Sequence, residues 1–213
     1  MTPEQWEESI RSLKKMRIAK IGLSHYTGMR AASWCTENAE TDFSIDAWGP
    51  YSRFEVNMIA IDIPGWGSLA IENLVFDLNG TLAKDGKILP GVKEKINSLS
   101  AKVKIYILTA DTQGTASKEI PGMNGELVKV SERNSREVKL RFLQSLDPMK
   151  TAAIGNGNND HLILREAFLG IAVMGEEGLS IGTMKDADVI VKNIIDALDM
   201  FLKPKRLIAT LRK

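Results

Sequence analysis

The sequence predicts an α/β protein built on a doubly wound, mostly parallel β-sheet. From residue 58 onward, short apolar runs of strand length alternate with segments in which apolar residues recur at helical spacing. Several of the apolar runs end in polar residues, as strands do when they deliver functional groups to one edge of a parallel sheet. Because ligands bind beyond the carboxyl ends of such strands, we expect a single site at that edge.

The predicted strands are apolar runs bounded by turn residues or charged residues. A β-hairpin comes first, with strands at 58–63 and 67–71 around the turn Pro64-Gly65-Trp66. The later strands are expected at 73–77, 103–108, 127–130, 151–154, 169–173 and 189–191.

The predicted helices are segments whose apolar residues fall on one stripe. Pro90 opens the first of them, early in a helix, where proline is tolerated. In the second, Phe142, Leu143 and Leu146 share one face with Val138. The four helices are expected at 90–99, 136–146, 161–167 and 194–202. Helices that alternate with strands imply that both faces of the sheet are covered.

Residues 1–57 do not follow this rhythm. An amphipathic helix is expected at 3–16 and a short strand at 18–23, whereas 36–53 is irregular. We therefore expect an N-terminal appendage, residues 1–57, and an α/β domain, residues 58–213.

The composition of the 213 residues is ordinary for a globular protein, with 44% hydrophobic and 26% charged residues. A formal net charge of +1 gives no bulk electrostatic attraction to nucleic acid or to a membrane. No apolar run approaches the length of a membrane span, and the single cysteine, Cys35, excludes an intramolecular disulfide. These observations favour a cytoplasmic protein with no nucleic-acid partner and no membrane insertion. Five cations near the C-terminus are expected to form a solvated tail: Lys203, Lys205, Arg206, Arg212 and Lys213.

The segment 74–83 is the most informative part of the chain. It is an apolar run that ends in Asp77, followed at once by the turn Leu78-Asn79-Gly80-Thr81. A buried strand that presents a carboxylate at the edge of a sheet has this pattern. Thr109 and the loop 155–160 also follow predicted strands, so we expect them beside Asp77.

Each of these features also has an explanation without chemistry. Taken alone, Asp77 is as consistent with a carboxylate that caps a turn as with a functional one, since Asn79-Gly80 is a turn signature by itself. The stretch 155–157 equally suits a plain strand-to-helix loop, with Asp160 as the N-cap of the helix. The convergence of several such features at one predicted edge favours the functional interpretation.

Together these segments resemble the motifs of the haloacid dehalogenase superfamily, and more narrowly its soluble proteins similar to the phosphorylation domain of P-type ATPases. The resemblance covers about residues 58–212. The motifs occur in order as Asp77-Leu78-Asn79-Gly80-Thr81, Leu108-Thr109-Ala110-Asp111, a lysine on the helix that precedes the last motif, and Gly155-Asn156-Gly157-Asn158-Asn159-Asp160. All four in order are a far more specific signal than the first alone.

The resemblance implies a role for each motif. Asp77 would be the nucleophile that attacks phosphorus and becomes an aspartyl phosphate. Thr109 and the backbone N–H of Ala110 would hold the phosphoryl oxygens. Lys139 would neutralise the developing charge, with Arg136, one turn earlier, as the alternative cation. A Mg²⁺ ion would be held by oxygen donors. These donors would be Asp77, the main-chain carbonyl of Asn79, Asn156 and Asp160.

Two residues depart from the superfamily pattern. Asn79 stands where most phosphatases of this class carry an acid that protonates the leaving group and later activates water. An amide cannot exchange a proton at neutral pH, and losing general acid–base catalysis typically costs roughly 10²–10⁴-fold in rate. Asn156 replaces the first acid of the last motif and removes a negative charge from the metal site. We therefore expect slow phosphatase activity, with a phosphorylated Asp77 that persists.

The sequence leaves no room for a cap domain. The path from Thr81 to Pro90 is short, and so is the segment 112–126. An open site is consistent with a phosphoprotein as well as with a small phosphorylated substrate. The same pattern is consistent with an alternative function, that of a catalytically silent pseudo-phosphatase that binds and regulates a phosphorylated ligand or protein partner. A soluble partner of a membrane transporter is a third interpretation.

The N-terminal segment carries a second, shorter resemblance. Gly22-Leu23-Ser24-His25-Tyr26-Thr27-Gly28, followed by Ala31, is similar to the C-terminal end of metallo-β-lactamase-like hydrolases, where such a histidine binds metal. That fold needs several further histidines, and this chain has only His25 and His161. A complete dinuclear site of that type is therefore excluded.

Overall fold

The computed structural model describes residues 57–110 and 120–213. The helix and strand expected in the N-terminal appendage, and the segment around His25, lie outside the described residues. The boundary expected near residue 57 therefore stays a prediction.

The chain divides into two compact units. One of them, residues 57–62 and 69–212, contains the main sheet and the candidate site described below. Of the other unit, the structure describes only residues 63–68 and the last residue.

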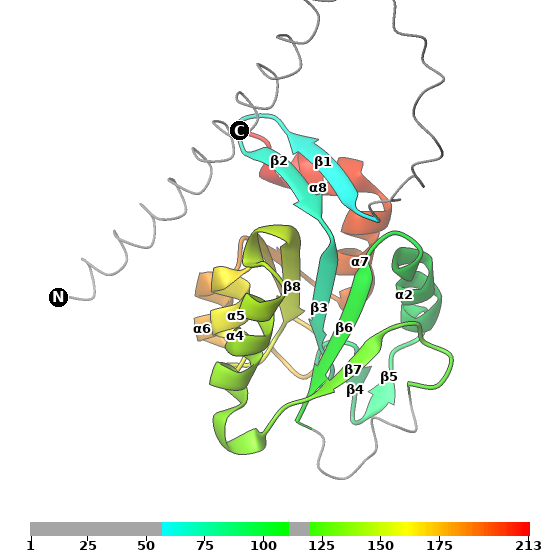
Figure 1. The fold of residues 1–213 in the computed structure, drawn as a ribbon, viewed down its shortest axis with the longest axis vertical. Coiled ribbons are helices and arrows are strands. Elements are labelled where there is room, and N and C mark those ends of the chain that lie inside the picture. The colour runs from blue at the N-terminus through cyan, green and yellow to red at the C-terminus, as the bar shows by residue number, and fades with distance from the viewer. Residues whose placement is uncertain (1–56, 111–119) are drawn as a thin grey trace, which may run out of the picture. The chain divides into compact units, whose positions relative to one another are not determined.

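Six strands form one parallel sheet in the order β10-β9-β8-β3-β6-β7 (Figure 1). They are β3 (Asn73–Asp77), β6 (Lys104–Thr109), β7 (Glu126–Lys129), β8 (Thr151–Gly155), β9 (Leu169–Val173) and β10 (Val189–Val191). The chain winds outward from β3 through β6 and β7, then returns to the other side of β3 and continues through β8, β9 and β10. The predicted doubly wound α/β fold is therefore confirmed, and β3 lies at the point where the winding direction reverses.

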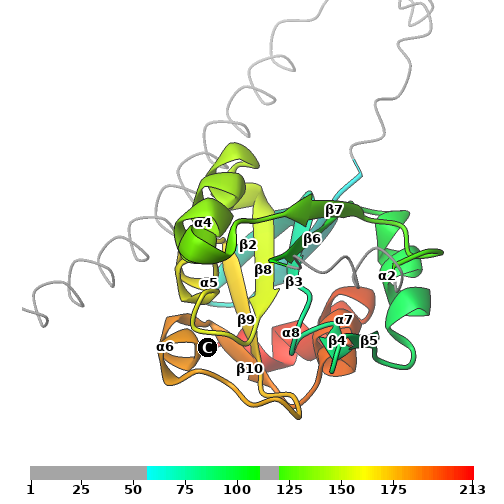
Figure 2. The same ribbon diagram turned by 90° about the horizontal axis from the view of Figure 1, so that it is seen from below.

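Helices cover both faces of this sheet, as expected (Figures 1 and 2). On one face α4 packs against α5, and α5 against α6. On the other face α2 packs against α7, and α7 against α8. The helices are α2 (Val92–Ser100), α4 (Ser135–Ser145), α5 (His161–Glu166), α6 (Ile181–Asp186), α7 (Ile194–Leu202) and α8 (Pro204–Leu211). Two short 3₁₀ helices, η2 (Glu132–Asn134) and η3 (Pro148–Lys150), precede α4 and β8.

Strand β3 lies inside the sheet, between β8 and β6, and is buried along its whole length. All five of its residues are buried, including both polar ends. At one end, the side-chain amide of Asn73 donates to the Leu146 carbonyl over 3.0 Å, which satisfies a donor that burial would otherwise leave unpaired. At the other end, Asp77 pairs in register with Leu108 of β6. The strand therefore carries one carboxylate to the carboxyl edge of the sheet.

The core between the sheet and α4–α5 is made of aliphatic residues from both layers. Its fully buried members are Val75, Leu108, Leu143, Ala153, Ile163, Leu164, Ala167 and Ala172. Small residues on β8 and β9 allow α5 to lie close to the sheet, since a side chain at Gly170 would collide with the Leu164 carbonyl. This packing fixes the loop that joins β8 to α5.

Two hairpins accompany the main sheet. The predicted hairpin is present as β1 (Ile59–Ile63) and β2 (Gly67–Ile71), a separate two-stranded sheet. A second, unpredicted hairpin pairs β4 (Ala83–Lys84) with β5 (Lys87–Ile88). Each of its strands is two residues long, so it leaves no periodic signal. It occupies the short path between Thr81 and Pro90 where no cap domain was expected.

Some expected boundaries are corrected by the structure. Helix α2 begins at Val92, and Pro90 lies before it rather than within it. Gly91 is the N-cap and has a φ of 81°, a left-handed conformation that glycine adopts without strain. Helix α6 was not predicted from the sequence.

The C-terminal segment is a helix rather than only a solvated tail. Its cations are exposed, as expected, but α8 also buries Leu207 completely. Pro204 occupies an early helical position. Arg206 forms an ion pair with Asp199 of α7 over 3.0 Å. The high density of cations concealed this amphipathic helix in the sequence.

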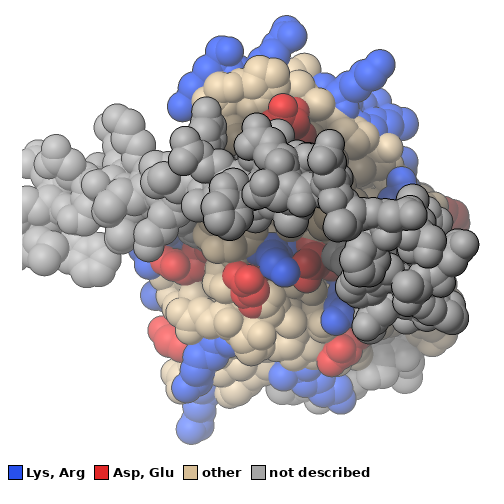
Figure 3. Space-filling model, turned by 45° about the horizontal axis from the view of Figure 1, so that its top comes forward, with Lys and Arg blue, Asp and Glu red and all other residues tan. Residues whose placement is uncertain are grey.

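Charged side chains of both signs are interspersed over the described part of the face in Figure 3. This distribution matches the near-neutral net charge of the chain. Among the described helices, none has both the length and the apolar character needed to cross a bilayer.

Candidate active site

Asp77 lies at the end of β3, where the chain turns sharply. The carbonyl of Leu78 accepts hydrogen bonds from the backbone N–H groups of Leu82 and Ala83, both over 2.9 Å. Gly80 donates its N–H to the Ala83 carbonyl over 2.8 Å and has a φ of +77°. The turn therefore holds the chain after Asp77 in one conformation, with Asn79 exposed at its outer side.

Lys139 joins the two carboxylates of the predicted site. Its Nζ lies 2.6 Å from Oδ1 of Asp77 and 2.6 Å from Oδ1 of Asp160. The lysine side chain is 1% exposed, although it belongs to a helix whose other residues are mostly accessible. Such deep burial of a lysine requires paired charges. The structure thus brings Asp77, Lys139 and Asp160 together, and we call these three residues the acidic cluster.

Asp160 organises the loop after β8. Its Oδ2 accepts hydrogen bonds from the backbone N–H groups of Asn156, over 3.1 Å, and Gly157, over 2.9 Å. Asp160 occupies the N-cap position of α5, but its side chain makes no capping hydrogen bond to that helix. The plain N-cap explanation therefore does not account for this carboxylate, which faces the loop and Lys139 instead.

The first and last motifs meet directly. Thr81 Oγ1 donates to Oδ1 of Asn156 over 3.1 Å, and both residues are buried. A Cβ atom at Gly80 would overlap Nδ2 of Asn156. Only glycine allows this approach, so the glycine of the first motif has a packing reason as well as a conformational one.

The β9–α6 connection and helix α6 also form hydrogen bonds with the loop after β8. Asn156 Nδ2 donates to the Gly178 carbonyl over 3.1 Å, and Ser180 N donates to the Asn156 carbonyl over 3.0 Å. Thr183 Oγ1 donates to the Gly157 carbonyl over 2.5 Å from a fully buried position. These positioning residues were not predicted from the sequence. Their hydrogen bonds join residues more than twenty positions apart, and no local pattern signals them.

The second motif lies at the same edge. Thr109 is the last residue of β6 and is 1% exposed. Its neighbour Leu108 pairs with Asp77 and accepts a hydrogen bond from Leu78 N over 3.1 Å. Ala110 is half-buried, and Asp111 lies outside the described residues. Sheet register alone therefore puts Thr109 next to the turn that follows Asp77.

The acidic cluster has one cation for two carboxylates, and this balance sets its electrostatics. Burial, with a further contribution from the Asp160 carboxylate, raises the pKa of Asp77 to about 7, against the opposing effect of Lys139. Burial by itself would lower the pKa of Lys139, but the Asp77 and Asp160 carboxylates outweigh it and raise that pKa. Lys139 is therefore a permanent cation, whereas Asp77 changes its charge near neutral pH.

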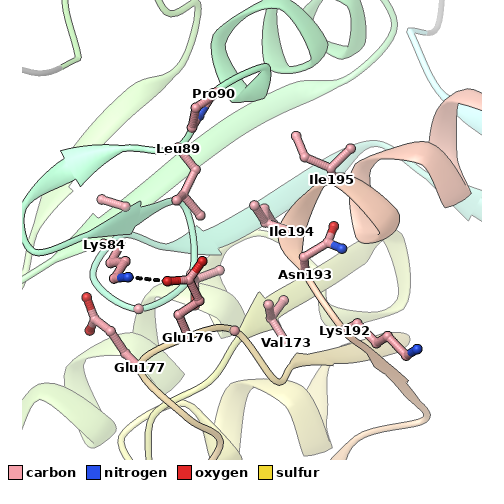
Figure 4. Close-up of a pocket in the computed structure, with 14 residues that line it drawn as sticks. Lys84, Leu89, Pro90, Val173, Glu176, Glu177, Lys192, Asn193, Ile194 and Ile195 are labelled. Atoms are coloured by element: carbon pink, nitrogen blue, oxygen red, sulfur yellow. Dashed lines mark hydrogen bonds and ion pairs between the residues drawn. The ribbon is translucent and has the colours of Figure 1, made fainter.

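A pocket of about 310 Å³ adjoins the back of the first-motif turn (Figure 4). Leu89, Val173 and Ile194 give it apolar walls, and Lys84 and Glu176 form an ion pair at its side (Figure 4). Gly80 and Thr81 also line it, but the three residues of the acidic cluster do not. The pocket therefore contacts the turn after Asp77 without containing the Asp77 carboxylate.

Comparisons with known proteins place the chain in a family. No protein-family model matches it. An uncharacterised protein of Methanocaldococcus jannaschii is 49% identical over 78 residues, which are 35% of this chain and 84% of that protein. Another from the same organism is 56% identical over 39 residues, which are 18% of this chain and 89% of that protein. The chain belongs to the same family as these two proteins.

Solved structures identify the fold. A HAD superfamily hydrolase of subfamily III A from Legionella pneumophila has a TM-score of 0.51 at 15% identity and covers 66% of this chain and 86% of its own. The fold is that of the haloacid dehalogenase superfamily. A 3-deoxy-D-manno-octulosonate 8-phosphate phosphatase from Moraxella catarrhalis, solved with magnesium, phosphate and KDO, has a TM-score of 0.51 at 17% identity over 67% of this chain and 94% of its own. The cobalt-bound phosphatase of the same kind from Haemophilus influenzae has a TM-score of 0.53 at 13% identity over 67% of this chain and 94% of its own.

A distant relative fits the narrower resemblance. A soluble P-type ATPase-like phosphatase of Methanocaldococcus jannaschii is 26% identical over 145 residues, which are 65% of this chain. This chain spans only 52% of the length of that phosphatase. The resemblance drawn from the four motifs is thus confirmed for the haloacid dehalogenase fold.

Divalent cations in the relatives raise the question of whether the residues of this site fit one. Among residues 57–110 and 120–213, no cluster of three or more His, Cys, Asp or Glu side chains could hold a metal ion. The donors at the edge are nevertheless all oxygens, which Mg²⁺ prefers. Asp77 and Asn156 each keep 8% of their surface exposed, whereas Asp160 is fully buried. The donor chemistry fits Mg²⁺ with one accessible carboxylate, and Asp160 would join only if Lys139 moved away.

Proposed function

We propose that this protein is a slow, Mg²⁺-dependent phosphohydrolase that acts through an aspartyl phosphate on Asp77. The observation that carries the proposal is the buried ion pair between Asp77 and Lys139, with Nζ 2.6 Å from Oδ1, at the carboxyl end of the central strand. Stability is a poor explanation for these buried charges, because burying the carboxylates of Asp77 and Asp160 with Lys139 as their single cation is unfavourable. The haloacid dehalogenase fold and the distant phosphatase relative support the same reaction class.

The proposed chemistry begins with attack by a carboxylate oxygen of Asp77 on phosphorus. A new O–P bond forms as the bond from phosphorus to the leaving oxygen breaks, and that oxygen takes a proton from water. Lys139 would stabilise the negative charge that gathers on the phosphoryl oxygens, and Thr109 with the Ala110 N–H would hold these oxygens. A water molecule then hydrolyses the acyl phosphate and restores the Asp77 carboxylate.

Mg²⁺, held by Asp77, Asn156 and the main-chain carbonyl of Asn79, would supply the positive charge that offsets repulsion between carboxylate and phosphoryl group. Asp160 would orient Lys139 and the loop 155–160, and would become a further ligand only in a rearranged site. With one accessible carboxylate, we expect this Mg²⁺ to be bound weakly.

Turnover would be slow because of Asn79. This exposed side chain can donate a hydrogen bond to a leaving oxygen but cannot transfer a proton. Both the departure of the leaving group and the activation of water would therefore rely on solvent. The aspartyl phosphate should accumulate when a reactive phosphoryl donor is present.

Phosphoryl labelling tests this proposal. The full chain is incubated with acetyl phosphate and Mg²⁺, and the peptide that contains Asp77 is analysed by mass spectrometry. We expect a phosphate adduct that is stable to acid, is removed by hydroxylamine, and is absent from Asp77→Asn. Asp85→Asn, at an exposed aspartate on the β4–β5 turn, is the matched control and should keep the adduct.

The alternative function gives a different result. A catalytically silent protein that only binds phosphorylated partners would show no adduct in any variant. Phosphate release that is equal in wild type and Asp77→Asn would also overturn the proposed nucleophile.

Asn79→Asp sharpens the test. A carboxylic acid at this position would restore proton transfer, so hydrolysis should rise at least about tenfold, towards the roughly 10²–10⁴-fold that general acid–base catalysis provides. The adduct should then become harder to trap. An unchanged rate would mean that a missing acid is not what limits turnover.

A further inference from the structure

Helix α6 carries a buried hydroxyl group that forms its hydrogen bond outside its own helix. Thr183 is fully buried, and its Oγ1 donates to the carbonyl of Gly157 over 2.5 Å. A threonine in a helix commonly bonds the carbonyl four residues before it, as Thr210 of α8 does with Arg206 over 3.0 Å. Thr183 does not follow this pattern. Its hydroxyl group therefore supports the loop after β8 rather than its own helix.

The carbonyl that Thr183 contacts belongs to the residue that holds Asp160. The Gly157 carbonyl also accepts a hydrogen bond from the backbone N–H of Asp160 over 2.9 Å. The Gly157 N–H donates to Oδ2 of Asp160, again over 2.9 Å. Both backbone polar groups of Gly157 thus bond to Asp160, so a shift of this glycine would move the Asp160 carboxylate.

Asp160 transmits this constraint to Lys139. Its other oxygen, Oδ1, lies 2.6 Å from Nζ of Lys139, and that Nζ lies 2.6 Å from Oδ1 of Asp77. Because a lysine side chain is flexible, the position of its ammonium group depends on the partners that hold it. Asp160 is fully buried and the Lys139 side chain is 1% exposed, so water competes little for these contacts. A series of hydrogen bonds therefore runs from Thr183 to Asp77.

Neighbouring residues hold α6 against the same loop. Ser180, the N-cap of α6, donates its backbone N–H to the Asn156 carbonyl over 3.0 Å. A Cβ atom at Gly182 would lie 3.0 Å from Oδ1 of Asn158, a tight contact that glycine avoids. Helix α6 also packs against α5, the helix that follows the loop (Figure 2). Removing the hydroxyl group of Thr183 would leave these contacts in place.

We propose that Thr183 is a positioning residue for the reaction at Asp77. Its hydroxyl group fixes Gly157 and hence the Asp160 carboxylate, and so holds the ammonium group of Lys139 against Asp77. The effect on the reaction rests on the proposed function, in which Lys139 stabilises the phosphoryl oxygens. The alignment of Lys139 does not rest on it, and can be measured without a phosphoryl donor.

Two pairs of side chains isolate the hydroxyl group. Threonine and valine have nearly the same shape and differ in this group, and serine and alanine differ in the same way. Thr183→Val and Thr183→Ala therefore remove the hydroxyl group, whereas Thr183→Ser keeps it. Thr210→Val removes a hydroxyl group that bonds within α8 and is the matched control.

The environment of the Lys139 ammonium group is the first measurement. A proton–nitrogen NMR spectrum of the full chain, recorded with a chelator present, detects lysine ammonium groups that are shielded from exchange with water. The signal that is absent from Lys139→Arg is the one to follow. We expect Thr183→Ser and Thr210→Val to keep the wild-type signal, whereas Thr183→Val and Thr183→Ala should shift or broaden it.

The rate at which acetyl phosphate labels Asp77 is the second measurement. At saturating Mg²⁺, Thr183→Val should slow labelling by roughly 10- to 100-fold, because a small misplacement of a catalytic group can have an effect of this size. Thr183→Ser should recover most of the wild-type rate, and Thr210→Val should keep it. The urea midpoint of each variant establishes that it is folded under these conditions. If Thr183→Val does not fold, the serine and alanine variants decide.

Three outcomes would overturn the proposal. The Lys139 signal could stay unchanged when the hydroxyl group is removed, which would make Thr183 a support for folding alone. Labelling could proceed at the wild-type rate in Thr183→Val. Thr183→Ser could be as impaired as Thr183→Ala, which would assign the effect to side-chain volume. The absence of a phosphate adduct from wild type would instead count against the proposed function, while the NMR comparison would still test the alignment.

Discussion

Two buried carboxylates, one at the end of the central strand and one on helix α7, have nearly the same exposure and opposite surroundings. Asp77 is 8% exposed and shares Lys139 with a second carboxylate, Asp160. Asp199 of α7 is 6% exposed and is surrounded by cations from three segments. These are Lys95, Lys203 and Arg206.

The two groups shift in opposite directions. Burial and the Asp160 carboxylate raise the pKa of Asp77 to about 7. Hydrogen bonds from Lys95 and then Lys203 lower the pKa of Asp199. Similar exposure therefore leads to different chemistry, and the balance of neighbouring charges decides which. The carboxylate that shares one cation with a second acid has a raised pKa, whereas the one with an excess of cations joins α2, α7 and α8.

Removing the cation of the acidic cluster should have the largest effect. Lys139→Met leaves two buried carboxylates without a counter-ion, and we expect a loss of about 3–5 kcal/mol in the free energy of unfolding at pH 8. Urea unfolding in the presence of a chelator measures it. Lys102→Met, at an exposed turn position, should stay within about 0.5 kcal/mol of wild type. Equal losses of unfolding free energy in the two variants would show that Lys139 does not stabilise the two carboxylates as their counter-ion.

Asp77→Asn should change how stability depends on pH. The pKa of Asp77 is raised from its ordinary value of 3.8 to about 7 in the folded protein. Between these values the folded protein holds a proton that the unfolded chain has released, so wild-type stability falls as pH rises across this window. The amide that replaces the carboxyl group in this variant has no such proton. The variant should therefore gain on wild type from pH 4 to pH 8 by a few kcal/mol, since one pKa unit corresponds to about 1.36 kcal/mol.

Urea unfolding of both proteins at pH 4 and pH 8, with chelator present, checks this prediction. A difference between wild type and Asp77→Asn that does not vary with pH would contradict the raised pKa. The same variant is expected to lack the phosphate adduct, so stability and labelling can be compared on one sample.

Asp199→Asn should have a smaller effect of the opposite sign. Because the pKa of Asp199 is lowered, its contribution is present above the unfolded-state pKa and is lost as pH falls through the folded-state value. We expect a loss of about 1 kcal/mol at pH 7, which disappears under acidic conditions. Asp85→Asn serves as the control. A loss that persists at low pH would assign the role of Asp199 to packing rather than to charge.

The exposed ion pair beside the pocket should have the smallest effect. The side chains of Lys84 and Glu176 are 42% and 73% exposed. Solvent and salt screen such a pair, so Glu176→Gln should leave the urea midpoint unchanged at physiological ionic strength. A clear shift would mean that the link from the β4–β5 hairpin to the β9–α6 loop contributes more than its exposure suggests.

Much of the architecture could be predicted from the sequence. Strand β9, strand β10 and helix α7 have the predicted limits, because each is a compact apolar or amphipathic segment with polar neighbours. Helix α8 was missed because five cations outweighed Leu207 in the pattern. The β4–β5 hairpin was missed because two-residue strands have no period to detect.

The candidate site was less accessible to sequence reasoning. Asp77 could be located from its strand and turn, but its pairing with Lys139 joins residues 62 positions apart. The helical pattern after Lys139 favours that lysine, but its role rests on the family resemblance. The support of Gly157 by Thr183, 26 positions away, left no trace in the sequence. Interactions of this kind depend on how α4 and α6 pack on the sheet, which local patterns do not encode.

The turn after Asp77 also bears on how the protein ages. Asparagine followed by glycine deamidates when the glycine nitrogen attacks the side-chain amide and closes a five-membered ring. In the folded chain the N–H of Gly80 is hydrogen-bonded to the Ala83 carbonyl over 2.8 Å, and the residue is buried with a φ of +77°. That attack is therefore hindered while the turn is intact. Stored native protein should keep its amide at position 79, whereas unfolded chains would slowly convert it to a carboxylic acid and so acquire the group that this site lacks.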